Sequence, residues 1–225
     1  MKFSLMRPAL ALGVAAVLAS CGGGKAMYPV RVTVINPLYE GLILSTNGQD
    51  YAVPPVSTAG ATYTFSFPNQ IEYGTVYNVI PKGATATSAG AQPKHMQCAP
   101  GQIPPNSGTA GQFQSIDITY NCTLNVYPIG GTIKGLKGTG LVLINGSTAS
   151  AYSPSPVVDA SNVPTGADIT FTMPSAVTWN TTYGVTVLTQ PTSPAQTCTV
   201  ANGTGTIDQA VEDAKGVTNI IVTCQ

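Results

Sequence analysis

The sequence beyond residue 27 reads twice, and this internal repeat constrains the fold more than any other feature. The offset between matched segments runs from 99 to 106 and back to 102 residues, as insertions in loops would produce. Each copy spans about 95 residues, the size of a domain rather than of a solenoid unit. We therefore expect two tandem copies of one fold, at residues 28–123 and 124–225. The matched pairs are Gly41–Leu44 with Gly140–Leu143, Thr64–Pro68 with Thr170–Pro174, Gly74–Val79 with Asn180–Val185, and Ile118–Cys122 with Ile220–Cys224.

Both copies consist of short segments in which apolar and polar residues alternate. Tyr63, Phe65 and Phe67 alternate with polar residues, and residues 169–173 repeat the pattern. A period of two predicts half-buried strands, and clusters of Pro, Gly, Asn and Ser separate them. The mature chain has no helical period, and residues 208–215 are too few to count as a helix. About seven strands per copy predict an all-β fold of two immunoglobulin-like antiparallel sandwiches.

The N-terminus has the layout of an export signal. Lys2 and Arg7 precede an apolar run over residues 8–18. This run is too short for a transmembrane helix, which needs about 20 residues, but it suits the apolar region of a signal peptide. We expect residues 1–20 to be a cleaved signal peptide.

The next residues, Leu18-Ala19-Ser20-Cys21, resemble the lipobox of bacterial lipoproteins. This resemblance implies cleavage before Cys21, a diacylglycerol on its thiol and an acyl chain such as palmitate on its amine. Gly22 stands where an inner-membrane retention signal would place Asp, which implies the outer membrane, facing either the surface or the periplasm. Residues 21–27 would be a short tether. The alternative is an ordinary signal peptide followed by a chance cysteine.

The four remaining cysteines predict two disulfides, because an exported chain meets an oxidising compartment. Three pairings are open to Cys98, Cys122, Cys198 and Cys224, and the repeat selects Cys98–Cys122 and Cys198–Cys224. In each copy the two cysteines would face each other across neighbouring antiparallel strands. A metal site or a redox pair is the alternative. Zinc is disfavoured, because the sequence has no C-x-x-C and His95 is its only histidine.

Composition limits the partners. Only 8% of residues are charged, and removal of Lys2 and Arg7 leaves seven basic and nine acidic residues. Such a chain lacks the basic patch that nucleic-acid binding requires. The expected membrane contact is the lipid on Cys21.

We expect no catalytic residues, no cofactor and no metal ion. A Ser-His-acid triad would need His95, which lies on a loop beside a predicted bridge cysteine. Asp208, Glu212 and Asp213 would suit a weak Ca²⁺ site, and a solvated loop is the alternative.

The second copy resembles an immunoglobulin-like repeat that recurs in proteobacterial surface proteins and lipoproteins. The first copy departs from this pattern at Gln92–Cys98, and the resemblance implies a β-sandwich without an established activity. The residues that carry the resemblance are Gly135-Leu136, Gly138-x-Gly140-Leu141-Val142-Leu143, Tyr183-x-Val185-x-Val187-Leu188-x-Gln190-Pro191, Gln196-Thr197-Cys198-x-Val200-x-Asn202-Gly203-x-Gly205 and Val222-Thr223-Cys224.

These features predict a non-enzymatic outer-membrane lipoprotein that displays two modules for adhesion or protein contact. The first alternative is a periplasmic scaffold or accessory subunit that binds through an exposed strand edge. The second is a carbohydrate-binding module that uses Trp179, Tyr39 and Tyr51, because aromatic rings on loops can stack on sugars. The alternative role of these rings is to close the ends of the sandwiches.

Overall fold

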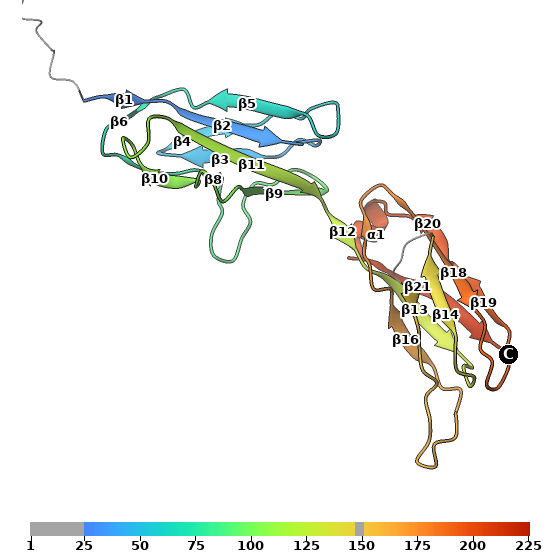
Figure 1. The fold of residues 1–225 in the computed structure, drawn as a ribbon. Coiled ribbons are helices and arrows are strands. Elements are labelled where there is room, and N and C mark those ends of the chain that lie inside the picture. Colours follow the sequence, from blue (N-terminus) through green and yellow to red (C-terminus); the bar gives the residue numbers. More distant parts are fainter. Residues whose placement is uncertain (1–24, 147–150) are drawn as a thin grey trace, which may run out of the picture.

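The computed structural model describes residues 25–146 and 151–225. The predicted signal peptide and Cys21 lie outside these residues. Among the described residues, strands pair only within residues 27–124 or within residues 126–224, and each stretch has its own hydrophobic core (Figure 1). We call these stretches the first and second modules. The all-β fold predicted from the alternating pattern is confirmed.

The first module begins with a short strand and ends with its longest. Its largest sheet has the order β5-β2-β11-β9, and a second sheet has the order β4-β3-β8. Two-stranded pairs β1-β6 and β10-β7 complete it. Its strands are β1 (Met27–Tyr28), β2 (Val30–Ile35), β3 (Ile43–Thr46), β4 (Gln49–Ala52), β5 (Thr62–Ser66), β6 (Ile71–Glu72), β7 (Val76–Asn78), β8 (Ile80–Pro81), β9 (Met96–Pro100), β10 (Ser107–Thr109) and β11 (Ile116–Leu124).

The second module repeats this plan. Its sheets have the orders β16-β13-β21-β19 and β15-β14-β18-β20, and β12 pairs with β17. Its elements are β12 (Val126–Tyr127), β13 (Ile129–Lys134), β14 (Val142–Asn145), β15 (Ala151–Tyr152), β16 (Ile169–Thr172), β17 (Val177–Thr178), β18 (Thr182–Thr189), β19 (Cys198–Ala201), β20 (Thr204–Thr206), α1 (Gln209–Asp213) and β21 (Val217–Cys224).

In each module one strand pair is parallel. β11 runs parallel to β2, and β21 runs parallel to β13, while the other pairs are antiparallel. The first long strand of a module thus lies beside its last. A period of two reports only which face of a strand is buried, so the sequence pattern does not indicate the direction of these pairs.

Each module has its own cluster of buried hydrophobic side chains in its core. Both are built from the inward-facing residues of the alternating segments, as the sequence pattern predicts. The first includes Val32, Leu44, Phe65, Ile118 and Tyr120, all buried. The second includes Ile133, Leu143, Phe171, Ile220 and Val222.

One strand of the second module is divided into two in the first. Residues 182–189 form the continuous strand β18, whereas Val79 separates β7 from β8 in the first module. The carbonyl oxygen of Val79 accepts hydrogen bonds from the Tyr120 hydroxyl and the Asn106 side chain, both at 2.8 Å. Valine stands at the place of Tyr120 in the second module, at Val222, so this hydroxyl is absent there.

A single α-helix, α1, is present in the described part of the chain. Asp208 caps its N-terminus by accepting a hydrogen bond from the backbone N–H of Val211 at 3.1 Å. Five residues are too few to display a helical period, so the sequence pattern does not reveal this element. The helix places Glu212 beside His95 of the first module.

Candidate interaction site

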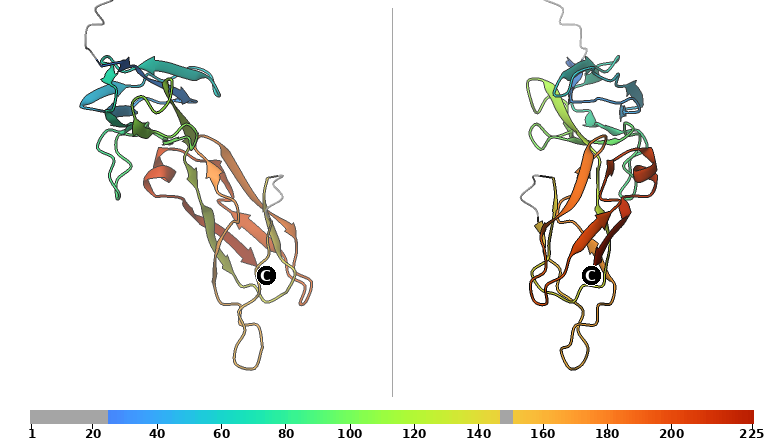
Figure 2. Two further views of the ribbon diagram at one scale, coloured as in Figure 1. Left: turned by 60° about the vertical axis from the view of Figure 1, so that its left-hand side comes forward. Right: turned by 90° about the vertical axis from the view of Figure 1, so that its right-hand side faces the viewer.

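A hairpin extends from the end of the second module that is remote from the first module (Figures 1 and 2). It lies between β15 and β16, and we call residues 157–165 the distal hairpin. The backbone N–H of Thr165 donates to the carbonyl oxygen of Val157 at 2.8 Å, and that of Asp159 donates to Val163 at 2.9 Å. An isolated bridge joins Val158 to Pro164.

The tip of the distal hairpin is held by one carboxylate. Asp159 Oδ1 accepts hydrogen bonds from the backbone N–H groups of Ser161 at 2.8 Å and Val163 at 2.9 Å. Asn162, between them, adopts a left-handed φ of 60°, a conformation that asparagine tolerates better than most residues. The hairpin is therefore an ordered projection.

The distal hairpin exposes three valines. Val157, Val158 and Val163 have relative exposures of 40%, 47% and 55%. Because side chains alternate along a ladder, Val157 and Val163 lie on one face of the hairpin and Val158 lies on the other. Both faces of this projection therefore expose apolar side chains, which suits a protein contact site. The two copies diverge in sequence at residues 147–165, which marks this segment as a candidate site, but the sequence alone points to no particular side chain in it.

A cluster of aromatic side chains joins the two modules. The imidazole of His95, just before β9, stacks on the indole of Trp179, with ring centroids 3.7 Å apart and planes 3° apart. The Tyr39 ring meets His95 edge-on at 5.1 Å, and the Trp179 Nε1–H donates to the Tyr39 hydroxyl at 3.2 Å. Three aromatic rings from both modules thus pack together at the junction.

Glu212 of α1 supplies the charge at this junction. His95 Nδ1 donates to Glu212 Oε2 at 2.6 Å, and the Tyr127 hydroxyl and the Asn125 amide donate to Oε1. The side chains of His95 and Glu212 are only 14% and 19% exposed. Burial raises the pKa of Glu212, but the hydrogen bonds from Tyr127, His95 and Asn125 outweigh burial and hold this pKa below its usual range.

The link between the modules is short. Only Asn125 lies between β11 and β12. Its backbone N–H donates to His95 at 2.8 Å, and its carbonyl oxygen accepts from the Trp179 N–H at 2.8 Å. The side chain and the backbone of the linker therefore bind both modules, which restricts their relative motion.

The three aromatic residues predicted as ligand contacts do not lie in one place. Trp179 and Tyr39 meet at the junction. Tyr51 lies in β4, where its ring stacks on Phe65 at 3.7 Å and its hydroxyl hydrogen-bonds with Tyr63 at 2.8 Å. All three rings therefore have partners within the protein.

The two predicted disulfides, Cys98–Cys122 and Cys198–Cys224, are present. In each, the cysteines face each other across antiparallel strands, with Cα atoms 4.0 Å apart. The connection between the two bridged strands is longer than a simple hairpin. It contains a short strand, β10 or β20, that joins another sheet.

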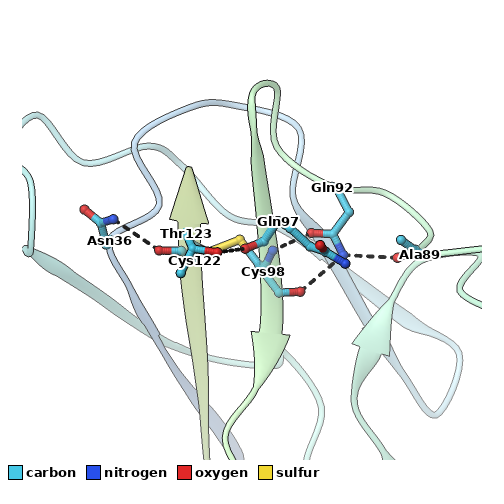
Figure 3. The surroundings of a disulfide bond; sticks show 7 residues. All are labelled: Asn36, Ala89, Gln92, Gln97, Cys98, Cys122 and Thr123. Atoms are coloured by element: carbon cyan, nitrogen blue, oxygen red, sulfur yellow. Dashed lines mark hydrogen bonds between the residues drawn. A yellow bond between two sulfur atoms is a disulfide. The ribbon is translucent and has the colours of Figure 1, made fainter. Parts of the chain in front are cut away.

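A glutamine side chain supports each disulfide, and Figure 3 shows the one beside Cys98–Cys122. Gln92 accepts from the Cys98 backbone N–H at 2.8 Å and donates to the Cys98 carbonyl oxygen at 3.2 Å. Gln190 makes the same pair of bonds with Cys198, at 2.8 and 3.0 Å. The counterpart of Gln92 is therefore Gln190, six and eight residues before the respective cysteines, and not Gln196 of the Gln-Thr-Cys approach.

The acidic residues considered for Ca²⁺ each have another partner. Asp208 caps α1, Asp213 accepts from Gln209 at 2.8 Å, and Glu212 binds the junction. Within residues 25–146 and 151–225, no group of three or more His, Cys, Asp and Glu is arranged to hold a metal ion. In the same ranges, no helix combines the length and the apolarity needed to cross a membrane.

Comparison with known proteins gave no match: no family model, no curated protein and no solved structure is significantly similar to this chain.

Proposed function

We propose that this chain is a non-enzymatic outer-membrane lipoprotein, anchored through Cys21, that displays two immunoglobulin-like modules, each with its own internal disulfide, for adhesion or protein contact. The distal hairpin is the observation that carries the proposal. It places an ordered apolar surface at the opposite end of the molecule from β1, and β1 follows the proposed anchor (Figure 1).

The junction supports this function mechanically. Display at a distance from the membrane requires that the outer module keep its orientation relative to the inner one. The contacts of His95, Trp179 and Glu212, together with a one-residue linker, resist bending at this point. A flexible linker would instead let the hairpin sweep back toward the membrane.

The chemistry of the hairpin favours a protein partner over a glycan. Its exposed apolar residues are valines, whereas sugars are usually held by flat aromatic faces. One face of the Trp179 indole is covered by His95, and Tyr51 stacks on Phe65. The carbohydrate-binding alternative would therefore need these rings to be released from their present partners.

Photo-crosslinking in living cells tests the contact. A photoreactive amino acid replaces Ala160, which is exposed at the tip of the distal hairpin, and in a separate chain it replaces exposed Ser57 in the first module. We expect a discrete adduct from position 160 and none from position 57. Val157, Val158 and Val163 changed together to Thr, which is β-branched like Val, should reduce the adduct at 160. Equal adducts at both positions, or none at 160, would contradict contact through the hairpin.

Protease treatment of intact cells separates surface display from the periplasmic alternative. Digestion of the second module while a periplasmic control protein survives would support adhesion or another surface contact. Digestion only after the outer membrane is opened would support a scaffold that acts in the periplasm.

A further inference from the structure

The end of the first module where β1 begins exposes large apolar side chains. Met27 is 49% exposed, Tyr73 58%, Phe113 54% and Ile103 91%. They are four of the ten large hydrophobic residues found exposed among the described residues. The gathering of so many on one part of a monomer points to an interaction surface.

Contacts and short separations in the sequence bring these residues to the same end of the module. Met27 pairs with Glu72 in the β1-β6 ladder, and the Tyr73 N–H donates to the Ala26 carbonyl oxygen at 2.7 Å. The Tyr73 ring lies over Gly111, where an added Cβ would clash with the ring carbons. Gly111 is two residues from Phe113.

The surface continues to the loop before β10. Phe113 and Pro104 line the same depression, together with Tyr77, and Ile103 directly precedes Pro104. β1, β6 and β10 all lie at the end of the first module that is remote from β12 (Figure 1). We call Met27, Tyr73, Ile103 and Phe113 the proximal face.

The charged side chains beside the proximal face are paired. Lys25 forms an ion pair with Glu72 at 3.2 Å, and Arg31 forms one with Asp117, a residue that lines the same depression as Phe113. Paired charges reduce the cost of placing this end against a less polar medium. Tyrosine is enriched at the boundary between lipid and water, and phenylalanine is a typical apolar residue of segments that bind there.

From these observations we infer that the proximal face contacts the bilayer that holds the anchor. The inference rests on the proposed lipidation of Cys21. Five residue-to-residue steps separate Cys21 from Ala26, and they span at most about 18 Å, so an anchored protein keeps this end within reach of the headgroups. Its apolar side chains would then enter the interface and orient the first module on the membrane.

Fluorescence quenching by brominated lipid tests this contact in the full lipidated chain. The chain is reconstituted in phosphatidylcholine–phosphatidylethanolamine vesicles with or without bromine on the acyl chains. The wild type carries one tryptophan, Trp179 at the junction, and its emission should be the same in both vesicles. Phe113→Trp should add emission that is lost in the brominated vesicles. Leu188→Trp, at a 59% exposed position in the second module, is the matched control and should not be quenched.

Each other outcome has a distinct meaning. If the full chain does not float with vesicles in a density gradient, the lipid anchor and this inference are both overturned. If it floats but Trp at 113 is not quenched by brominated lipid, only the bilayer contact is overturned. Protection of that tryptophan from acrylamide without quenching by lipid would assign the face to a protein instead. Tyr73→Trp serves as the second probe if Phe113→Trp does not fold.

Discussion

At the scale of single residues, the paired glutamines are the least expected stabilising feature. Gln92 and Gln190 each satisfy the backbone N–H and C=O of a disulfide cysteine at the edge strand of a sheet. A strand at the edge of a sheet leaves such groups without a ladder partner. The glutamine amide, which both donates and accepts, takes the place of the missing strand.

Gln190→Ala should therefore destabilise the chain. The Cys198 N–H and C=O lose their partner, and we expect a loss of about 1–2 kcal/mol in the free energy of unfolding, measured in urea. Gln190→Glu is the matched control: its carboxylate can accept from the N–H but cannot donate to the C=O, so its loss should be intermediate. An alanine variant as stable as the wild type would show that solvent replaces the glutamine.

Glu212 should make the stability of the junction depend on pH. Its pKa is lowered in the folded chain, because hydrogen bonds from Tyr127, His95 and Asn125 outweigh the effect of burial. A lowered pKa means that folding favours the ionised carboxylate. This stabilisation is fully present above the ordinary carboxyl pKa of 4.5 and is lost as the pH falls through the lower folded value.

Glu212→Gln should remove this pH dependence. At neutral pH we expect the variant to lose about 2 kcal/mol of unfolding free energy, because hydrogen bonds to a buried charge are stronger than neutral ones. The difference from wild type should shrink below pH 4.5, measured by urea unfolding with Trp179 fluorescence as the probe. Asp213→Asn, which removes a charge from the same helix without touching His95, should change little. A difference that stays constant from pH 7 to pH 3 would contradict this role for Glu212.

At the scale of elements, the sequence predicts the strands and the disulfides, because both follow from patterns that recur in each copy. Alternation over Tyr63–Phe67 and 169–173 indicated strands, and the duplicated cysteines selected the two disulfides that the structure contains. The parallel pairs β2-β11 and β13-β21 were not predicted, since burial alternates in the same way in both directions.

The contacts at the junction could not be predicted from the sequence, for a different reason. His95 and Glu212 are 117 residues apart, and neither belongs to a repeated segment. From the sequence alone, His95 suggests at most a member of a triad and Glu212 at most a calcium ligand. Nothing in the local pattern indicates that α1 meets the loop before β9, because this contact forms only when the two modules are packed together.

At the scale of the whole molecule, three sites follow one another from one end of the molecule to the other (Figures 1 and 2). The proximal face lies beside β1, the His95–Trp179–Glu212 junction lies between the modules, and the distal hairpin projects from the far end. In the proposed lipoprotein the first orients the molecule on the membrane, the second holds the modules at a fixed angle to each other, and the third meets the partner. The account requires that the junction be rigid, since a flexible one would uncouple the hairpin from the membrane.

Distances between spin labels in the two modules test this requirement most directly. Labels carried by unnatural amino acids at exposed Ser57 and Thr199 leave the disulfides intact. We predict a single narrow distance distribution for the otherwise unchanged chain, and a broad one when His95 and Trp179 are both changed to Ala. A broad distribution in the unchanged chain would show that the modules move independently, and it would contradict the account.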